Sequence, residues 1–425
     1  MKYHNTDQGF EECMEAIFTA ISFAEQGEYD TAREILRAWD RGETRTYLSH
    51  DSRKQRPSCR QERTTSPIGR SISNNGVCHE GGGTGSSLRK YLSVLLGVIG
   101  IFLIQTSVGW SDEAKEVRIG FFPNITHSQA LLAKGNGAYE KATGLNVKWS
   151  AFNAGPSAVE ALFAEAIDMT FIGPNPAING YIKSQGKSFV IVAGGASGGA
   201  ALVVREDSGI QRQKDFSDKI IATPQLGNTQ DVAARAWFKK NGYTLKEKGG
   251  SLTVLPLPNP DQLTMFQKKE IDGAWTVEPW VSRLVLEGGG RVFLEEKELW
   301  RDGRYVTTHL IVNRSFLVSH PALVKKIIQA HVEITMDIQA NRDKAISEVN
   351  EQIKKETGKS LPEAVIKSAF QRVEFTWDPV KNSLHQSAQS AFEAGFIKTE
   401  PKLEGIYDLR LLNEVLLEKK INTIQ

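Results

Sequence analysis

Several short segments are rich in Gly, Asn, Ser and Thr and could hold a small anion through hydrogen bonds alone. The clearest is "PQLGNTQD" (224–231), where Asn228 and Thr229 separate an apolar run from a helical pattern without any lysine or arginine. The first turn of a helix has unpaired backbone N–H groups and a partial positive charge, so it can bind an oxyanion without a cationic side chain. The simpler interpretation is that Asn228 and Thr229 only cap the helix that follows.

Similar segments supply further hydrogen-bonding or aromatic side chains. They are "PNITHSQ" (123–129), "NAGPSA" (153–158), "GPNPAING" (173–180), "GGASGG" (194–199) and "VEPW" (277–280). His127 can donate to an oxyanion, Glu278 can accept a hydrogen bond from a ligand amine, and Trp280 can form an aromatic wall. Each has a structural alternative, since a lone histidine often belongs to a core and Glu278 can stabilise the start of its own helix.

Signatures of catalysis, nucleotide binding and metal binding do not appear in the sequence. It has no "HExxH", P-loop or "GxGxxG" pattern, and Cys13, Cys59 and Cys78 are its only cysteines. The formal net charge is +2, from 52 basic and 50 acidic residues, which gives no reason to expect a nucleic-acid partner. We therefore expect a binding protein rather than an enzyme, with no catalytic residue, no cofactor and no metal.

The candidate segments lie where strands give way to helices. From Val117 onward, short β-rich runs such as "VRIGFF" and "DMTFIG" alternate with helical patterns such as "PSAVEALFAEA". This alternation predicts βαβ units, an α/β fold and largely parallel sheets. Ligands of such sheets lie beyond the carboxyl ends of the strands, so we expect the candidate segments to converge there.

Three landmarks of this pattern occur twice in the same order. Their spacing is about 104 or 105 positions, and the pairs are Asn136-Gly137 with Asn241-Gly242, Pro156 with Pro260, and Ile167-Asp168 with Ile271-Asp272. Asn-Gly ends a helix through a left-handed residue, and Pro suits the first turn of the next helix. The repeat predicts two similar lobes, with lobe 1 at 116–205 and lobe 2 at 206–308.

Two apolar runs, "AALVVRE" (200–206) and "THLIVNR" (308–314), follow the two copies of the repeat. In a two-lobed protein they are the natural crossings between the lobes. We therefore expect a hinge at about 204–207 and 306–310, and a cleft that closes around a ligand.

Two interpretations stay open for the residues at the second crossing. Thr307, Thr308 and His309 either touch a ligand or only serve the hinge. The remainder of the chain, 309–425, has apolar residues at helical spacing and is expected to complete lobe 1.

A signal peptide is predicted at 88–111. It starts with Arg89 and Lys90, continues with an apolar run to Ile104, and ends in small residues. The apolar run is shorter than the roughly 20 residues that span a bilayer, which disfavours the alternative of a permanent anchor. We expect cleavage near residue 110 and export to the periplasm.

The preceding residues, 1–87, form an extension that is expected to be poorly structured, because 44–85 is rich in Ser, Arg, Gln and Gly without periodicity. Two interpretations stay open. Translation can start later, at Val77 or Leu88, or the extension can be genuine coding sequence, since 24–39 is amphipathic and resembles one helix of a tetratricopeptide hairpin.

The exported part resembles the periplasmic substrate-binding components of ABC importers for sulfonates, taurine and nitrate, and within that class the aliphatic sulfonate-binding proteins. The resemblance covers about residues 115–420 and lies in "VRIGFFPNITHSQALLAKGNG", "FNAGPSAVEALFAEAIDMTFIGPNPAINGY", "KIIATPQLGNTQDVAARAWF" and "EIDGAWTVEPWVSRLVLEGGG". It implies the type II periplasmic binding fold, with two interlobe crossings and a helical C-terminal region.

The resemblance also implies which residues face the ligand. Together with the residues chosen by position, the candidate substrate-binding set is Pro123, Asn124, His127, Gly173, Asn175, Ser197, Gly198, Gly227, Asn228, Thr229, Gln230, Glu278, Trp280 and Thr308. Relatives for nitrate or bicarbonate use cationic side chains, so the absence of Lys and Arg from these segments favours an organosulfonate.

The implied function is the periplasmic solute-binding component of an ABC importer, a monomer whose partners are a small oxyanion and the permease and ATPase of the inner membrane. Two alternatives stay open. The same fold binds or makes thiamine-pyrimidine precursors, although those enzymes have a cysteine-rich segment that the exported part lacks. The protein can also be a ligand sensor for a membrane receptor.

Overall fold

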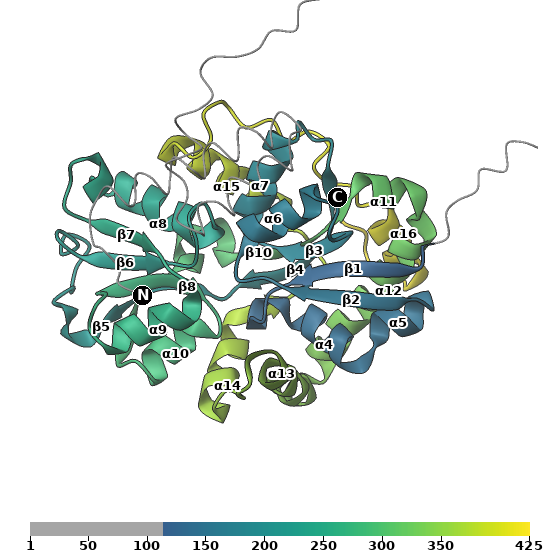
Figure 1. Cartoon of the computed structure of the whole chain (residues 1–425), viewed down its shortest axis with the longest axis horizontal. Coiled ribbons are helices and arrows are strands. Elements are labelled where there is room, and N and C mark those ends of the chain that lie inside the picture. The colour runs from purple at the N-terminus through teal and green to yellow at the C-terminus, as the bar shows by residue number, and fades with distance from the viewer. Residues whose placement is uncertain (1–113) are drawn as a thin grey trace, which may run out of the picture. The chain divides into compact units, whose positions relative to one another are not determined.

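The computed structural model describes residues 114–425, so the predicted extension (1–87) and signal peptide (88–111) lie outside the described residues. The described residues belong to one compact unit and form two lobes, each built on one sheet (Figure 1). We call the lobe with the six-stranded sheet the large lobe and the lobe with the five-stranded sheet the small lobe. No helix within 114–425 has the length and apolar character that a membrane span requires.

The sheet of the large lobe has the strand order β11-β4-β10-β3-β1-β2. Its strands are β1 (Glu116–Phe121), β2 (Asn146–Ala151), β3 (Met169–Ile172), β4 (Phe189–Gly198), β10 (Val306–Asn313) and β11 (Val373–Phe375). The helices that accompany these strands early in the chain are α4 (Ser128–Asn136), α5 (Ala138–Thr143), α6 (Gly155–Phe163) and α7 (Pro174–Lys183), with the 3₁₀ turn η3 (Ile125–His127).

The sheet of the small lobe has the order β7-β6-β8-β5-β9. Its strands are β5 (Ala200–Arg205), β6 (Ile220–Thr223), β7 (Thr253–Pro256), β8 (Gly273–Val277) and β9 (Gly290–Glu295). Its helices and turns are α8 (Thr229–Lys240), α9 (Asn259–Gln267), α10 (Trp280–Leu286), η4 (Glu206–Ser208), η5 (Lys246–Lys248), η6 (Glu296–Leu299) and η7 (Arg301–Gly303).

Both sheets are mixed, not largely parallel as the alternation of elements suggested. The βαβ units give parallel pairs, β1 with β2 and β3, and β6 with β7 and β8. By contrast, β10 runs antiparallel to its neighbours β3 and β4, and β5 runs antiparallel to β8 and β9. The reason is that β5 and β10 each enter their sheet from the other lobe instead of after a crossover helix.

The two crossings lie earlier in the chain than the sequence suggested. Residues 200–205 form β5, which pairs wholly within the small sheet, and residues 306–313 form β10, which pairs wholly within the large sheet. The change of lobe therefore occurs at Gly199, with φ at +79°, and between η7 and β10. The apolar residues of β5 and β10 are paired within a sheet, so the connections between the lobes are made by the short stretches that precede these strands.

Apolar side chains cover both faces of each sheet, as an α/β arrangement requires. On one face of the large sheet, Phe121, Phe171 and Leu310 pack against Ile327 and Ile328 of α12. Different residues of the same sheet pack with α6 and α7 on its other face. The small sheet has a corresponding pair of clusters, the first of which contains the fully buried Trp275.

The repeat landmarks occupy equivalent places in the two lobes. Asp168 accepts a hydrogen bond from the backbone N–H of Arg118 in β1, at 2.8 Å, and Asp272 accepts one from Ile220 in β6, at 2.9 Å. Gly137 and Gly242 both have positive φ, at +67° and +81°. In each lobe, the acidic residue thus fixes the start of the next strand against the first strand.

The C-terminal helices pack on both lobes, whereas the sequence suggested packing on lobe 1 only. They are α11 (Arg314–Ser319), α12 (Pro321–Ala340), α13 (Arg342–Thr357), α14 (Glu363–Arg372), α15 (Lys381–Ala394) and α16 (Arg410–Glu418). Helices α12 and α13 lie against α4, and α16 lies against α12. Helix α14 contacts α10 and α15 contacts α8, so the C-terminal segment joins the small lobe to the large one (Figure 1).

Candidate ligand-binding cleft

Segments that follow strands of both lobes meet in a small cavity of about 20 Å³, which we call the cleft cavity. Six of the residues selected from sequence line it, namely Asn124, His127, Gly173, Asn228, Thr229 and Gln230. The other lining residues are Phe122, Thr126, Asn153, Ala154, Pro224, Asn259, Val277 and Thr307. Of the six segments expected to converge, five contribute lining residues, and "GGASGG" (194–199) contributes none.

The cleft cavity collects the starts of four helices. Helix α6 begins after Ala154, α7 after Gly173, α8 after Asn228 and α9 after Pro258, and none of these four N-cap residues makes a side-chain capping hydrogen bond. The first N–H groups of a helix have no intrahelical acceptor and carry partial positive charge. Four such helix starts border one cavity, which makes it suitable for an anion.

Asn228 does not cap α8 with its side chain, so the simpler interpretation of this residue is wrong. Its Nδ2 donates instead to Oε1 of Gln230, at 3.2 Å, while the residue is only 7% exposed. Thr229 is the first residue of the helix proper, and its buried Oγ1 has no hydrogen-bond partner. Both side chains are available to a ligand.

Asp231 holds the turn before α8. Its carboxylate accepts from the backbone N–H of Gly227 at 2.9 Å and from Thr223 Oγ1 at 2.8 Å, and it pairs with Arg235 at 3.0 Å. Gly227 has φ at +73°, a conformation that favours glycine. Gly227 therefore shapes the turn and does not line the cleft cavity.

His127 lies in the cleft cavity as a neutral hydrogen-bond donor. Its Nδ1 accepts from the backbone N–H of Phe122 at 3.2 Å, which leaves the proton on Nε2. Burial lowers the pKa of its imidazole to about 3. The neutral Nε2–H of His127 can therefore donate a hydrogen bond to an oxyanion.

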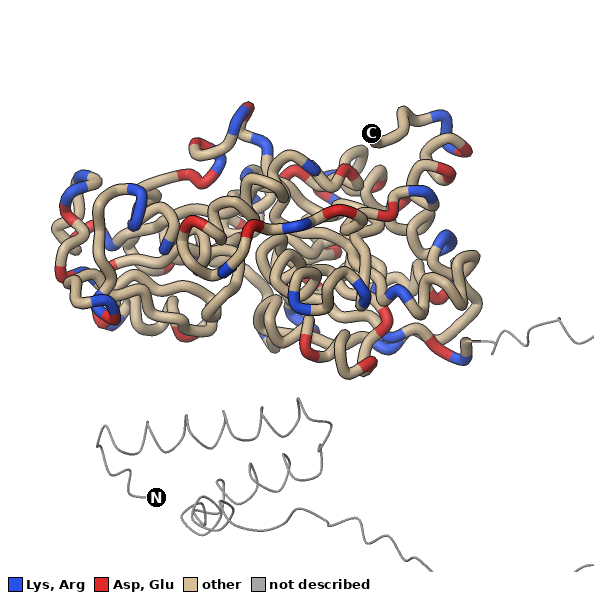
Figure 2. The backbone as a smooth tube through the Cα atoms, turned by 90° about the horizontal axis from the view of Figure 1, so that it is seen from above, with Lys and Arg blue, Asp and Glu red and all other residues tan. Residues whose placement is uncertain are grey.

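No charged side chain lines the cleft cavity. Basic and acidic residues are instead scattered over both lobes (Figure 2). Residues 114–425 also contain no group of three or more His, Asp or Glu side chains arranged to hold a metal ion. An anion in the cleft cavity would be bound by amide, hydroxyl, imidazole and backbone donors.

Pro123 and Trp280 lie at one end of the cleft and line a second cavity of about 460 Å³. Trp280 Nε1 donates to Asn124 Oδ1 across the lobes, at 3.2 Å, and the guanidinium of Arg283 lies 4.8 Å from the centre of the indole ring. Trp280 is thus an interlobe contact as well as an aromatic wall.

Glu278 has a different environment from the one expected of a ligand acceptor. Its side chain is fully buried and accepts hydrogen bonds from the N–H of Ser282 at 3.1 Å and from its hydroxyl at 2.9 Å. Arg372 of α14 lies 3.1 Å from Oε1. Burial raises the pKa of Glu278 to about 7, against the opposing effects of Ser282 and Arg372. Because Ser282 and Arg372 already occupy the carboxylate, Glu278 is not free to meet a ligand amine.

Ser197, Gly198 and Thr308 join the strands beside the crossings. Ser197 Oγ accepts from the N–H of Tyr305 at 3.3 Å, and the carbonyl of Gly198 accepts from Thr307 Oγ1 at 2.5 Å. Thr308 is fully buried, and its Oγ1 has no partner. Of the residues considered at the second crossing, Thr307 is the one that lines the cleft cavity.

Sequence reasoning omitted several lining residues, including Thr126, Asn153 and Asn259. Asn153 belongs to a segment selected from sequence, "NAGPSA" (153–158), but Asn259 starts α9, after the strand β7, and belongs to none of those segments. The repeat contained the missing signal, because Pro156 and Pro260 are equivalent and mark the same helix start.

The two lobes are closed on each other. Besides the bond from Trp280 to Asn124, the N–H of Ile125 donates to the carbonyl of Glu278 at 3.2 Å, and Gln225 Nε2 donates to Ser157 Oγ at 3.4 Å. A volume of about 20 Å³ holds roughly one water molecule. A larger ligand therefore needs the lobes to separate before it can enter.

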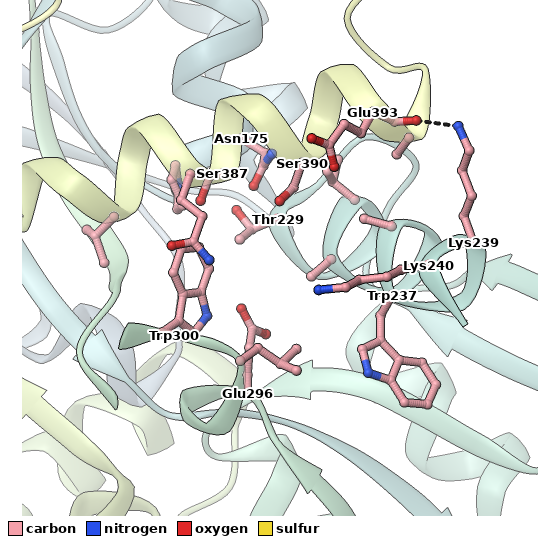
Figure 3. Close-up of a pocket in the computed structure, with 18 residues that line it drawn as sticks. Asn175, Thr229, Trp237, Lys239, Lys240, Glu296, Trp300, Ser387, Ser390 and Glu393 are labelled. Carbon is pink, nitrogen blue, oxygen red and sulfur yellow. Dashed lines mark hydrogen bonds between the residues drawn. The ribbon is translucent and has the colours of Figure 1, made fainter. Parts of the chain in front are cut away.

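Asn175 lies on the other side of the cleft and lines a third cavity, of about 440 Å³, which we call the side cavity. Thr229 lines both the side cavity and the cleft cavity. The side cavity is formed by α7, α8, η6 and α15 (Figure 3).

The sequence profile of the NMT1-like family matches residues 111–353. A Bacillus subtilis (strain 168) protein named "Putative aliphatic sulfonates-binding protein" is 25% identical over 344 residues, which cover 78% of this chain and 98% of that protein. The taurine-binding periplasmic protein of Escherichia coli (strain K12) is 24% identical over 231 residues, which cover 54% of this chain and 69% of that protein.

Solved structures show the same fold. The alkanesulfonate-binding protein SsuA from Xanthomonas axonopodis pv. citri, bound to MOPS, has a TM-score of 0.56 at 20% identity and covers 68% of this chain and 96% of its own. The periplasmic aliphatic sulphonate binding protein SsuA from Escherichia coli has a TM-score of 0.55 at 22% identity. The expected type II periplasmic binding fold is thereby confirmed.

Proposed function

Because the chain belongs to the NMT1-like family, we propose that it is the solute-binding component of an ABC importer and that its ligand is a small organic oxyanion, an aliphatic sulfonate. The relatives named for aliphatic sulfonates and for taurine support this class of ligand. They also support a periplasmic location and a membrane permease with its ATPase as partners.

The observation that carries the proposal is the cleft cavity with its four helix starts and no charged side chain. Helix N–H groups, the amides of Asn228 and Asn124, and the neutral Nε2–H of His127 supply donors for sulfonate oxygens. Such donors bind an anion without a full ion pair, so release to a permease does not require a buried charge pair to be broken.

The proposed cycle follows from the closed arrangement of the lobes. The lobes separate about the crossings at Gly199 and before β10, a ligand enters and meets the helix starts of both lobes, and closure restores the bond from Trp280 to Asn124. Since closure brings donors of both lobes to one ligand, the ligand stabilises the closed form by its extra affinity for that form. The closed form is the one offered to the permease.

Two other functions have less support. An enzyme that makes thiamine-pyrimidine precursors would use a cysteine-rich segment, and 114–425 contains no cysteine. A sensor for a membrane receptor would bind its ligand in the same way. The relatives named for a ligand are binding proteins, which favours transport or sensing over catalysis.

A binding screen by thermal shift, followed by calorimetry, tests the proposal. We expect alkanesulfonates to stabilise the protein more than nitrate, bicarbonate or thiamine precursors do. Asn228→Ala combined with Thr229→Ala should weaken sulfonate binding at least tenfold, or ~1.4 kcal/mol. Asn241→Ala is the matched control, because Asn241 lies at the other end of α8 and bonds only to its own helix through Trp237. Equal affinity in the double variant and the control would contradict the site.

A further inference from the structure

The side cavity and the cleft cavity share one lining residue. Thr229 lines both cavities. At two other places, neighbouring residues of the chain line different cavities: Gly173 lines the cleft cavity and Pro174 the side cavity, and Thr307 lines the cleft cavity and Val306 the side cavity. With the lobes closed, the cleft cavity has room for roughly one water molecule, whereas the side cavity, at about 440 Å³, has the size of a small-molecule site.

One face of α8 forms an apolar wall of the side cavity. Val232, Ala233, Ala236 and Trp237 recur at helical spacing along it, and Leu299 of η6 adds to the wall. Trp237 is drawn along the edge of the open space in Figure 3. This wall fits a hydrocarbon chain or ring rather than a second anion.

Two buried polar atoms lie where the side cavity meets the cleft. Asn175 is 3% exposed and its Nδ2 has no hydrogen-bond partner, and Thr229 is 6% exposed and its Oγ1 has none. An unpaired buried donor costs free energy unless a bound molecule satisfies it. These two donors therefore point to a ligand acceptor, such as a sulfonate oxygen, at this junction.

Glu296 provides the polar group of the side cavity away from this junction. It is 1% exposed, Trp275 Nε1 donates to its Oε2 at 2.7 Å, and its carboxylate points into the open space (Figure 3). Burial raises the pKa of Glu296 to about 7, while the indole N–H groups of Trp275 and Trp300 act in the opposite direction. Within 114–425 no lysine or arginine forms an ion pair with it.

Lys240 does not form an ion pair with Glu296. Its side chain is exposed and enters the side cavity from the far end of α8, facing Glu296 across the open space (Figure 3). Tyr305 is a further titratable group near Glu296; it is buried and stacks on Trp300 with ring centres 5.2 Å apart. Lys239 also lines the side cavity and donates to the carbonyl of Glu393. Because neither lysine forms an ion pair with Glu296, this buried carboxylate is a suitable partner for a cationic ligand group.

We propose that the side cavity holds the organic substituent of the ligand, and that this substituent is an apolar chain or ring that ends in an ammonium group paired with Glu296. The inference rests on the proposed function, since it places the sulfonate head at Thr229 and the helix starts. The inference implies that sulfonates with only a short substituent, such as ethanesulfonate, are not the preferred ligands. It also assigns the amine to Glu296 in place of Glu278, whose carboxylate Arg372 and Ser282 occupy.

Calorimetry with three sulfonates tests the size of the substituent. Ethanesulfonate, hexanesulfonate and ω-aminohexanesulfonate share one head group, and we expect affinity to rise at least tenfold at each step. Ala236→Phe places a ring in the side cavity and should weaken both six-carbon ligands at least tenfold while leaving ethanesulfonate unchanged. Equal binding of all three ligands to the wild-type protein would overturn the inference.

Glu296→Gln tests the ammonium partner. It keeps an acceptor for Trp275 but removes the charge, so the preference for ω-aminohexanesulfonate over hexanesulfonate should disappear and ethanesulfonate binding should not change. Glu298→Gln, at an exposed position of the same turn, is the matched control and should retain the preference. If Glu296→Gln does not fold, Ala236→Phe still decides whether the substituent enters the cavity.

The two proposals fail in different ways. Ethanesulfonate binding that depends on Asn228 and Thr229, with no effect of chain length or of Glu296→Gln, would refute the side-cavity inference and leave the proposed function standing. Absence of binding by all three sulfonates would refute both. A preference for the amino ligand that survives Glu296→Gln would refute the assignment of Glu296.

Discussion

Arg372 Nε lies 3.1 Å from Oε1 of Glu278, and this ion pair joins helix α14 to the small lobe at a carboxylate that is fully buried. Arg372 also pairs with Glu295 through Nη1. It comes directly before β11, which pairs with β4 in the large sheet. One arginine thus connects the large sheet to two acidic residues of the small lobe.

Arg372→Met should destabilise the protein by about 3 kcal/mol, because it leaves the buried Glu278 without its cation. The change is measured as the free energy of unfolding in urea. Arg410→Met is the control, since Arg410 is exposed and pairs only with Asp408, and we expect less than about 1 kcal/mol there. Similar losses in both variants would show that Arg372 acts as an ordinary surface residue.

Trp280→Phe should weaken ligand binding about fivefold. The substitution keeps an aromatic ring under Arg283 but removes the hydrogen bond to Asn124, and one such bond contributes about 1 kcal/mol to the closed arrangement. Calorimetry gives the affinity, and small-angle scattering gives the proportion of open molecules without ligand. An affinity equal to that of the wild-type protein would mean that this contact does not limit closure.

His127 should make the protein sensitive to acid. Its folded pKa is about 3, whereas the unfolded residue has a pKa of 6.5, so only the unfolded chain takes up a proton between these values. Stability is therefore present above pH 6.5 and lost as the pH falls towards 3, at up to about 1.4 kcal/mol per pH unit for one histidine. His127→Gln should lose less stability than the wild-type protein between pH 6 and pH 4.

The measurement for His127 is urea unfolding at several pH values. Buried His309 and His331 have lowered pKa values for the same reason, so both proteins lose stability in acid and the difference between them isolates His127. Parallel curves for the two proteins would indicate that His127 has the same pKa in the folded and unfolded chain, and that burial does not keep it neutral in acid.

Gly194→Ala should destabilise the large lobe by at least about 2 kcal/mol. A Cβ at this position would lie 2.1 Å from the carbonyl oxygen of Asp378, and that backbone is fixed by the bond from Gly194 N–H to Trp377 at 2.7 Å. Gly209→Ala is the control: its position is open but has φ at +76°, which costs about 1 kcal/mol. Thermal unfolding compares the two, and an equal loss would mean that the chain around Asp378 shifts easily.

The elements that carry regular periodicity could be predicted from sequence. The strands from 116 to 198 and the long helix α12 follow from apolar spacing, and the repeated Asn-Gly, Pro and Ile-Asp landmarks follow from local backbone requirements that act over a few residues. The segments around Asn228 and His127 were found for the same reason, because they lie directly after predicted strands.

Long-range pairing could not be predicted in this way. The occupation of Glu278 by Arg372 depends on a partner 94 positions away, on a helix whose sequence pattern indicates only an amphipathic surface. Likewise, Glu296 follows a strand as an ordinary acidic residue, and its burial depends on Trp275 and Trp300. The antiparallel orientation of β5 and β10 arises because the chain reaches each of them from the other lobe, and a local sequence pattern does not predict this.

The attachment of α14 and α15 to the small lobe has a consequence for how the protein can change over evolutionary time. Opening must strain or rearrange these contacts as well as the two chain crossings, so substitutions on the C-terminal helices shift the balance of open and closed molecules without touching the cleft. Measured affinity for a ligand includes that balance. Two homologues with identical cleft residues can therefore scavenge the same nutrient over different concentration ranges, through differences confined to the last third of the chain.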